Sequence, residues 1–243
     1  IDVPEGTDVM RNILIMSGVY QPLAERMRPQ NLDQFVGQTH ILGKNRVLHR
    51  MLASQKLYSI IFWGPPGVGK TTLARLIAKQ SNLNFISLSA VLDGVQQVRQ
   101  AVAQAQVHQE QFQQNTLLFI DEVHRFNKSQ QDAFLPFVED GTLVLVGATT
   151  ENPSFELNNA LLSRAKVLVL QPLSDEDLQR LLDQAIQFVL PELGQESGIV
   201  GISISDQARR LLIQSCDGDA RRLLNAFEQA LDYLDPDQAR VEL

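Results

Sequence analysis

Short apolar runs alternate with amphipathic stretches over the first two thirds of the chain. Apolar runs that end at a polar residue or a glycine-rich turn are typical of buried strands, whereas apolar residues spaced three and four apart indicate helices. Strands that are apolar almost throughout and alternate with helices predict a parallel sheet with helices on both faces. The expected strands are residues 59–63, 85–89, 116–120, 143–149 and 167–170, which makes the sheet five-stranded.

The helices of this α/β part follow from the same spacing. Residues 47–52 are amphipathic, residues 71–80 follow the first strand, and the glutamine-rich stretch 91–114 keeps valines on one face. That spacing favours a helix with a solvated outer face over low-complexity disorder. The residues from Ser129 to Asp132 resemble a capping box, which predicts a helix from there to Val138.

A change of pattern at Pro172 divides the chain. After it, the spacing predicts helices alone, over residues 175–189, 205–216 and 219–234. We therefore expect an α/β core over residues 21–171 and a small all-helical domain over residues 172–243. Residues 1–20 show no clear period, so we expect a tail or the remnant of a tag. The start at Ile1 instead of methionine indicates a fragment of a longer protein.

Composition narrows the class of protein. Hydrophobic residues at 44% and charged residues at 20% are ordinary globular values, and no apolar run approaches the roughly 18 residues of a membrane-spanning helix. The single Cys216 cannot form an internal disulfide, so we expect a cytoplasmic protein.

The charge is spread unevenly along the chain. The net charge of -7 argues against a general nucleic-acid binder, yet residues 22–79 hold nine Lys/Arg against two Asp/Glu. A positive zone of this kind attracts phosphate, either of a nucleotide or of a nucleic-acid backbone. Clustered surface charge without a ligand is the alternative.

A glycine-rich loop after the first expected strand has the spacing G-x-x-x-x-G-K-[ST] of a phosphate-binding loop. Its glycines let backbone N–H groups point at phosphate oxygens, Lys70 reaches the β- and γ-phosphates, and the Thr71 hydroxyl can ligate Mg²⁺. The helix that begins there adds its positive end. The pattern predicts ATP and Mg²⁺ as cofactors, bound by Gly64, Pro65, Pro66, Gly67, Val68, Gly69, Lys70, Thr71 and Thr72.

Polar residues follow the third and fourth expected strands. Asp121 can hold Mg²⁺, while Glu122 can orient and deprotonate an attacking water. Acidic residues that end strands are common, so this hypothesis depends on the phosphate-binding loop. A hydroxyl of Thr149 or Thr150 can fix the water, or the pair caps a turn.

Arginines at two places in the chain are candidates for stabilising phosphoryl transfer. Arg164 comes just before the last core strand, and Arg221 and Arg222 come at the start of a helix in the second domain. Arginines near transferring phosphate neutralise charge that builds up in the transition state, although a solvated arginine is the commoner case for either position alone. The histidines lack the spacing of metal ligands, so we expect no metal site built on His40, His49, His108 and His124.

In this order, the motifs resemble those of AAA+ ATPases of the clamp-loader branch. The likeness is carried by Pro-Pro-Gly in the phosphate-binding loop, the pair Asp121-Glu122, residues 147–150, Ser163-Arg164, and residues 218–221. Three stretches, residues 23–29, 121–133 and 147–157, are similar to the replication-associated recombination protein A family, whose eukaryotic relative is the Werner-helicase-interacting protein. The resemblance covers about residues 21–234.

The resemblance implies roles that spacing only suggests. Val36 and Gly37 match a segment beside the adenine, Thr150 matches the sensor-1 position, Arg164 matches an arginine finger offered in trans to a neighbouring subunit, and Arg221 matches sensor 2. The implied activity is a Mg²⁺-dependent, DNA-stimulated ATPase at stalled or gapped replication forks, in the bacterial cytoplasm or nucleoid.

The implied partners are ATP and ADP, single-stranded or forked DNA bound without sequence preference, and single-strand-binding or other replication proteins. Further copies of the chain would join it in a tetramer or ring through a C-terminal region beyond residue 243.

Two other functions stay open at this point. The residues from Asp121 to His124 also fit a DExH helicase, but such enzymes need a second RecA-like core, and the chain after Gly147 is predicted to be mostly helical. A nucleotide-dependent scaffold, which recruits partners without turnover, needs only the binding residues. Measured ATP hydrolysis would separate motor from scaffold.

Overall fold

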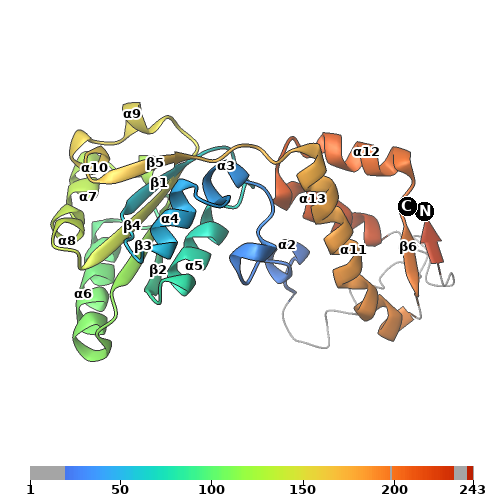
Figure 1. Cartoon of the computed structure of the whole chain (residues 1–243), viewed down its shortest axis with the longest axis horizontal. Coiled ribbons are helices and arrows are strands. Elements are labelled where there is room, and N and C mark those ends of the chain that lie inside the picture. Colours follow the sequence, from blue (N-terminus) through green and yellow to red (C-terminus); the bar gives the residue numbers. More distant parts are fainter. Residues whose placement is uncertain (1–19, 198, 233–239, 243) are drawn as a thin grey trace, which may run out of the picture. The chain divides into compact units, whose positions relative to one another are not determined.

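The computed structural model describes residues 20–197, 199–232 and 240–242, which form two compact units (Figure 1). The core unit is Pro29–Gln171. The helical unit combines the residues up to Arg28 with the chain from Pro172 onward.

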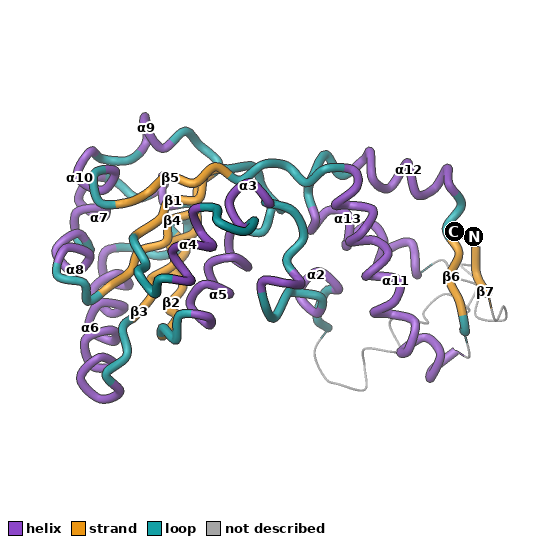
Figure 2. The backbone as a smooth tube through the Cα atoms, in the orientation of Figure 1, coloured by secondary structure: helices purple, strands orange, loops and turns teal. Residues whose placement is uncertain are grey.

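A five-stranded parallel sheet forms the centre of the core unit, with the strand order β2-β3-β4-β1-β5 (Figure 2). The predicted parallel sheet is therefore confirmed, and the strand ends differ from the expected ones by at most two residues. Strands β1 and β3 are apolar almost throughout because both of their faces are buried. The strands are β1 (Ser59–Trp63), β2 (Asn84–Ser89), β3 (Thr116–Asp121), β4 (Leu143–Thr149) and β5 (Ala165–Val169).

Helices cover both faces of this sheet, as the sequence predicts. Ile60 and Phe62 pack in one cluster with residues of α3 (Thr39–Leu42), α4 (Val47–Ala53) and α5 (Lys70–Gln80). Ile61, which points the other way, packs in a second cluster. That cluster includes residues of α6 (Val95–Phe112), α8 (Leu135–Glu139) and α10 (Asn159–Leu162) and lies next to α7 (Lys128–Asp132); the shorter elements of the unit are η1 (Leu32–Gln34), η2 (Val123–Arg125) and α9 (Pro153–Glu156).

Two predicted helices of the core unit differ from the observed ones. The helix expected from residue 91 begins at Val95, because the preceding residues form a turn closed by Asp93, whose carboxylate accepts the Ser89 N–H at 2.8 Å. The helix expected from Ser129 is two short helices, and its capping box is formed by Asn127 and Gln130. The second helix has Pro136 in its first turn, where a proline is tolerated. In the interior of one continuous helix the same proline would break the hydrogen bonding.

In the helical unit, the four helices that the structure describes pack around one apolar cluster. Leu23 is fully buried in this cluster, and its N–H donates to Glu228 Oε1 at 2.9 Å. The residues around it therefore group with the C-terminal helices, whereas the sequence analysis assigns residues 21–28 to the core. The helices are α2 (Leu23–Arg26), α11 (Asp175–Ser197), α12 (Asp206–Ser215) and α13 (Ala220–Leu231).

The prediction of helices alone after Pro172 is wrong in one detail. β6 (Gly201–Ser203) and β7 (Arg240–Glu242) pair in parallel, and strands of three residues are too short to show an apolar pattern. Helix α11 also continues through Pro191 beyond its expected end. The predicted tail up to residue 19 and the predicted last turn at residues 233–234 lie outside the described residues. Within the described part of the chain, no helix is long and apolar enough to cross a membrane.

Candidate active site

The strand order brings the sequence motifs together at one edge of the core sheet. Strand β4 pairs with β1 on one side and with β3 on the other. The phosphate-binding loop follows β1, Thr150 follows β4, and Glu122 follows β3. Because the strands are parallel, their carboxyl ends share one edge, which is where open α/β sheets bind ligands.

The glycines of the phosphate-binding loop are required by close backbone approach. A Cβ atom on Gly64 would lie 2.4 Å from the Leu170 carbonyl oxygen. Gly69 has φ of 93° and faces the ring of Phe35, whose Cζ would lie 2.6 Å from an added Cβ. Larger residues would close the loop or displace its neighbours, so the loop keeps a backbone-lined hollow of the kind that holds phosphate.

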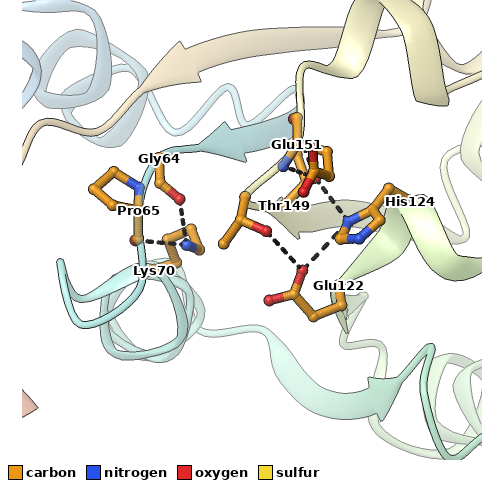
Figure 3. Close-up of polar contacts among 8 residues, drawn as sticks. Gly64, Pro65, Lys70, Glu122, His124, Thr149 and Glu151 are labelled. Carbon is orange, nitrogen blue, oxygen red and sulfur yellow. Dashed lines mark hydrogen bonds and ion pairs between the residues drawn. The ribbon is translucent and has the colours of Figure 1, made fainter.

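Lys70 is folded over this loop. Its Nζ donates to the Gly64 carbonyl at 2.6 Å and to the Pro65 carbonyl at 2.8 Å, and the residue is only 8% exposed (Figure 3). The ammonium is thus held inside the loop by neutral acceptors, which phosphate oxygens can replace with stronger charge-assisted contacts. Thr71 and Thr72 lie half-buried in the first turn of α5, directly after Lys70.

Glu122 has an unusual backbone conformation. Its φ of 52° places it in the left-handed region, which costs a residue with a Cβ about 1–2 kcal/mol. Such strain is found most often at functional positions. The Thr150 hydroxyl lies 3.5 Å from Glu122 Oε2, so the candidate base and the candidate water-fixing residue are neighbours. Asp121 ends β3 immediately before this turn.

Behind Glu122, the structure shows a contact between His124 and Thr149 that the sequence does not predict. The Nδ1 atom of His124 lies 3.3 Å from Glu122 Oε2 and 2.9 Å from the hydroxyl of Thr149 (Figure 3). Thr149 also accepts the Glu151 N–H at 3.0 Å, so it caps the turn after β4 while Thr150 contacts Glu122. A Glu-x-His spacing directly after a strand is the sequence feature that could have indicated the contact.

The candidate adenine segment is fixed beside the phosphate-binding loop. Val36 and Gly37 follow Phe35, whose ring packs against Gly69. The next residue, Gln38, is buried, and its amide makes two hydrogen bonds with the backbone of Gln171, at 2.7 and 3.0 Å. These contacts of Phe35 and Gln38 were not predicted, because they join segments that are far apart in the sequence.

Arg164 does not lie at this edge of the sheet. It comes directly before β5, whose first residue, Ala165, pairs with Ser59 at the start of β1. The arginine therefore lies at the amino edge, a strand length of roughly 17 Å from the carboxyl edge. Its guanidinium forms an ion pair with Glu139 and donates to the Ala160 carbonyl at 2.6 Å.

Arg221 belongs to the helical unit. It is an exposed residue in the first turn of α13, next to Arg222, whose N–H donates to the cap Asp219 at 2.9 Å.

The donor set suits ATP with Mg²⁺ better than a protein-only metal site. Among the described residues, no group of three or more His, Cys, Asp and Glu side chains could hold a metal ion. Mg²⁺ in phosphoryl-transfer sites is bound by one or two protein groups together with substrate phosphates and waters. A threonine hydroxyl and a carboxylate, as offered by Thr71 and Asp121, match that pattern.

The sheet order and the positions of these groups define a nucleotide-binding domain of the AAA class. In agreement, the model of the family "ATPase family associated with various cellular activities (AAA)" matches residues 60–173. Replication-associated recombination protein A of Escherichia coli is 49% identical over 220 residues, which are 90% of this chain and 48% of that protein. ATPase WRNIP1 of Dictyostelium discoideum is 43% identical over 212 residues, which are 87% of this chain and 24% of that protein.

A solved structure of the Thermotoga maritima RuvB Holliday junction branch migration motor is similar with a TM-score of 0.63 and 25% identity. The similarity covers 85% of this chain and 65% of that one. The chain carries an AAA ATPase domain over residues 60–173, and over 87–90% of its length it is similar to replication-associated recombination protein A and WRNIP1. It spans about half the length of the Escherichia coli relative.

Proposed function

We propose that this chain binds ATP with Mg²⁺ and hydrolyses it. The observation that carries the proposal is the meeting of the phosphate-binding loop, Glu122 and Thr150 at the carboxyl ends of three neighbouring strands. A binding protein needs the loop alone. A carboxylate beside a hydroxyl at the next strands adds what hydrolysis requires.

In the proposed mechanism, Lys70 exchanges the Gly64 and Pro65 carbonyls for oxygens of the β- and γ-phosphates. Thr71 and Asp121 would hold Mg²⁺, which neutralises phosphate charge when it is bound. Glu122 accepts a proton from the attacking water, while the Thr150 hydroxyl helps to orient that water. Arg221, in the first turn of α13, is proposed as a sensor of the nucleotide.

Steady-state ATP hydrolysis by the chain, with and without single-stranded or forked DNA, tests this proposal. Turnover that requires Mg²⁺ is expected. If the chain binds ATP but releases no phosphate beyond the Glu122→Gln background, the scaffold function replaces the ATPase.

We further propose that the substrate context is DNA at stalled or gapped replication forks. Support comes from the names of similar proteins. One relative is a replication-associated recombination protein, and one similar solved structure is a Holliday junction branch migration motor. The structure supports DNA contact through a difference in charge between the two helical layers of the core unit.

The layer that contains α4 and α5 is strongly basic. Residues 34–92 contain no Asp or Glu. The helices of the other layer, α6, α7 and α8, have two cations, Arg99 and Lys128, against three anions, Glu110, Asp132 and Glu139. The exposed cations of the basic layer are Lys44, Arg46, Arg50, Lys56, Arg75 and Lys79.

Four of these cations are available to a ligand. Among the described residues, no ion pair involves Lys44, Arg46, Arg50 or Lys56. Exposed cations in this arrangement attract a phosphate backbone without reading its bases, so binding should be independent of sequence and fall steeply with salt.

A matched pair of double variants tests the basic layer. Arg46→Gln with Arg50→Gln should weaken DNA binding and lower the salt slope by about 2, since each phosphate contact contributes about one to that slope. Arg99→Gln with Lys128→Gln removes two exposed cations from the other layer and should change little. Equal effects of the two pairs, measured by fluorescence anisotropy at several salt concentrations, would reject this surface as the DNA contact.

A further inference from the structure

A histidine and a threonine that have no part in the mechanism above lie directly behind the candidate base. The side chain of His124 is 8% exposed, so its ring nitrogens must find partners mainly within the protein. Its Nδ1 atom faces two groups, the Thr149 hydroxyl at 2.9 Å and Glu122 Oε2 at 3.3 Å (Figure 3). A nearly buried imidazole is thus placed between the carboxylate and β4.

The hydroxyl of Thr149 has one proton and two acceptors for it. Its Oγ1 lies 2.9 Å from His124 Nδ1 and 3.2 Å from the Glu151 carbonyl oxygen, and it accepts the Glu151 N–H. If the hydroxyl donates to Nδ1, the ring nitrogen has no proton, and the Glu122 carboxylate faces a nitrogen that cannot donate. If the hydroxyl donates to Glu151, Nδ1 can carry a proton and donate toward both Thr149 and Glu122.

The second arrangement gives each of these donors an acceptor. It joins the Glu122 carboxylate, His124 Nδ1–H, the Thr149 hydroxyl and the Glu151 carbonyl, and each donor then has an acceptor atom within 3.3 Å. The negative carboxylate oxygen also favours the tautomer with its proton on the nearer nitrogen.

We propose that His124 is a positioning residue that holds Oε2 of Glu122 through a protonated Nδ1, with Thr149 fixing the ring. This inference rests on the proposed ATP hydrolysis. Within the described residues, the contacts of the Glu122 carboxylate, from His124 and from Thr150, are both to Oε2. The other oxygen, Oε1, is left to accept the proton of the attacking water.

The anchor matters because Glu122 is attached to a backbone in the left-handed region. Glu122 lies between the end of β3 and the start of η2, and the described contacts of its carboxylate are those at its tip, with His124 and Thr150. A displacement of about 1 Å in a catalytic group can lower a rate by about 10²-fold. Loss of His124 should therefore slow hydrolysis and leave nucleotide binding intact, because no contact joins His124 to the phosphate-binding loop in the described structure.

Three substitutions of His124 separate positioning from packing. His124→Phe keeps the ring volume and removes both nitrogens, His124→Asn places an amide nitrogen near the position of Nδ1, and His124→Gln places it near Nε2. We expect kcat to fall about tenfold or more in the Phe and Gln variants, with KM for ATP unchanged, and to recover in large part in the Asn variant. Thr149→Val should lower kcat, and Thr149→Ser, which keeps the hydroxyl, should not.

Nitrogen NMR of the histidine ring gives a second test that does not depend on turnover. In the wild-type chain, the ring signal that disappears in His124→Phe should show a proton on Nδ1. A signal with Nδ1 unprotonated would overturn the proposal, whatever the activity of the variants.

Wild type and Glu122→Gln are measured in the same hydrolysis assay. If wild type shows no turnover, the proposed ATPase function and this inference are both rejected. If Glu122→Gln is inactive while His124→Phe hydrolyses ATP at the wild-type rate, only the inference is rejected. Equal loss in the Asn and Gln variants, together with a raised KM, would indicate that His124 only packs the site.

Discussion

Within the core unit, the groups proposed to act on ATP lie at the carboxyl edge of the sheet except for one arginine at the opposite edge. At the carboxyl edge, Lys70 is nearly buried inside its loop, and Glu122 is held from behind by His124. At the amino edge, the side chain of Arg164 is 36% exposed and that of its partner Glu139 is 50% exposed.

The two edges differ in how firmly their cations are held. At the carboxyl edge Lys70 and His124 are nearly buried, whereas the side chain of Glu122 is 31% exposed and its described contacts are with His124 at 3.3 Å and Thr150 at 3.5 Å. An exposed ion pair contributes only about 0–1 kcal/mol, so Glu139 holds the Arg164 side chain loosely. The cation of the carboxyl edge, Lys70, is thus enclosed by its loop. The Arg164 guanidinium at the amino edge can leave Glu139 for another acceptor, such as the phosphates on a second copy.

The largest effect is expected from removing the base of the carboxyl edge. Glu122→Gln keeps the shape of the side chain but cannot accept a proton, so kcat should fall by about 10²-fold or more. ATP affinity, measured by titration calorimetry, should stay near the wild-type value, because Glu122 makes no contact with the phosphate-binding loop in the described residues. Wild-type turnover in this variant would place the base elsewhere.

A somewhat smaller effect is expected from removing the cation of the same edge. Lys70→Ala loses charge-assisted contacts of about 1.5–3 kcal/mol, which corresponds to roughly a 10- to 10²-fold loss of MgATP affinity. The matched control is Lys79→Ala at the far end of the same helix, where the exposed Nζ donates to the Gln30 carbonyl at 2.9 Å. Unchanged affinity in Lys70→Ala would show that the loop does not bind the nucleotide.

The two edges also differ in how well the sequence predicts them. The buried strands are visible as apolar runs, and the phosphate-binding loop has a fixed spacing, so the sheet and the positions of Lys70 and Glu122 can be predicted locally. The contact between Gln38 and Gln171 joins residues 133 apart, and that between Thr149 and His124 joins residues 25 apart. Such contacts depend on the strand order, which no local pattern encodes.

Short elements were missed for a related reason. Helix α2 is a single turn whose place is decided by the burial of Leu23 and its bond to Glu228, 205 residues away. Apolar periodicity needs more than four residues to show which partner an element will choose. The sequence therefore predicts the central architecture and the reactive residues, and it leaves out the contacts that hold them in place.

The smallest measured change is a partial return of activity when subunits are mixed, and it is the most direct test of the two-edge comparison. Lys70→Ala subunits lack a working loop but keep Arg164, and Arg164→Ala subunits keep the loop but lack the arginine. If Arg164 acts in trans, each variant alone should be nearly inactive. In an equal mixture of freely exchanging subunits, about a quarter of the head-to-tail interfaces would join an intact loop to an intact arginine, and activity should return to about that fraction of the wild type.

The control for this experiment is Arg99→Ala, which removes an exposed arginine from α6 on a helical layer of the same unit. It should hydrolyse ATP at the wild-type rate by itself. Because β1 separates the start of β5 from the phosphate-binding loop by a full strand length, an arginine acting in its own subunit is not compatible with the observed sheet. If native mass spectrometry shows that subunits exchange and the mixture stays as inactive as its components, Arg164 does not complete a neighbouring site, and its pairing with Glu139 is then a surface contact of the core unit alone.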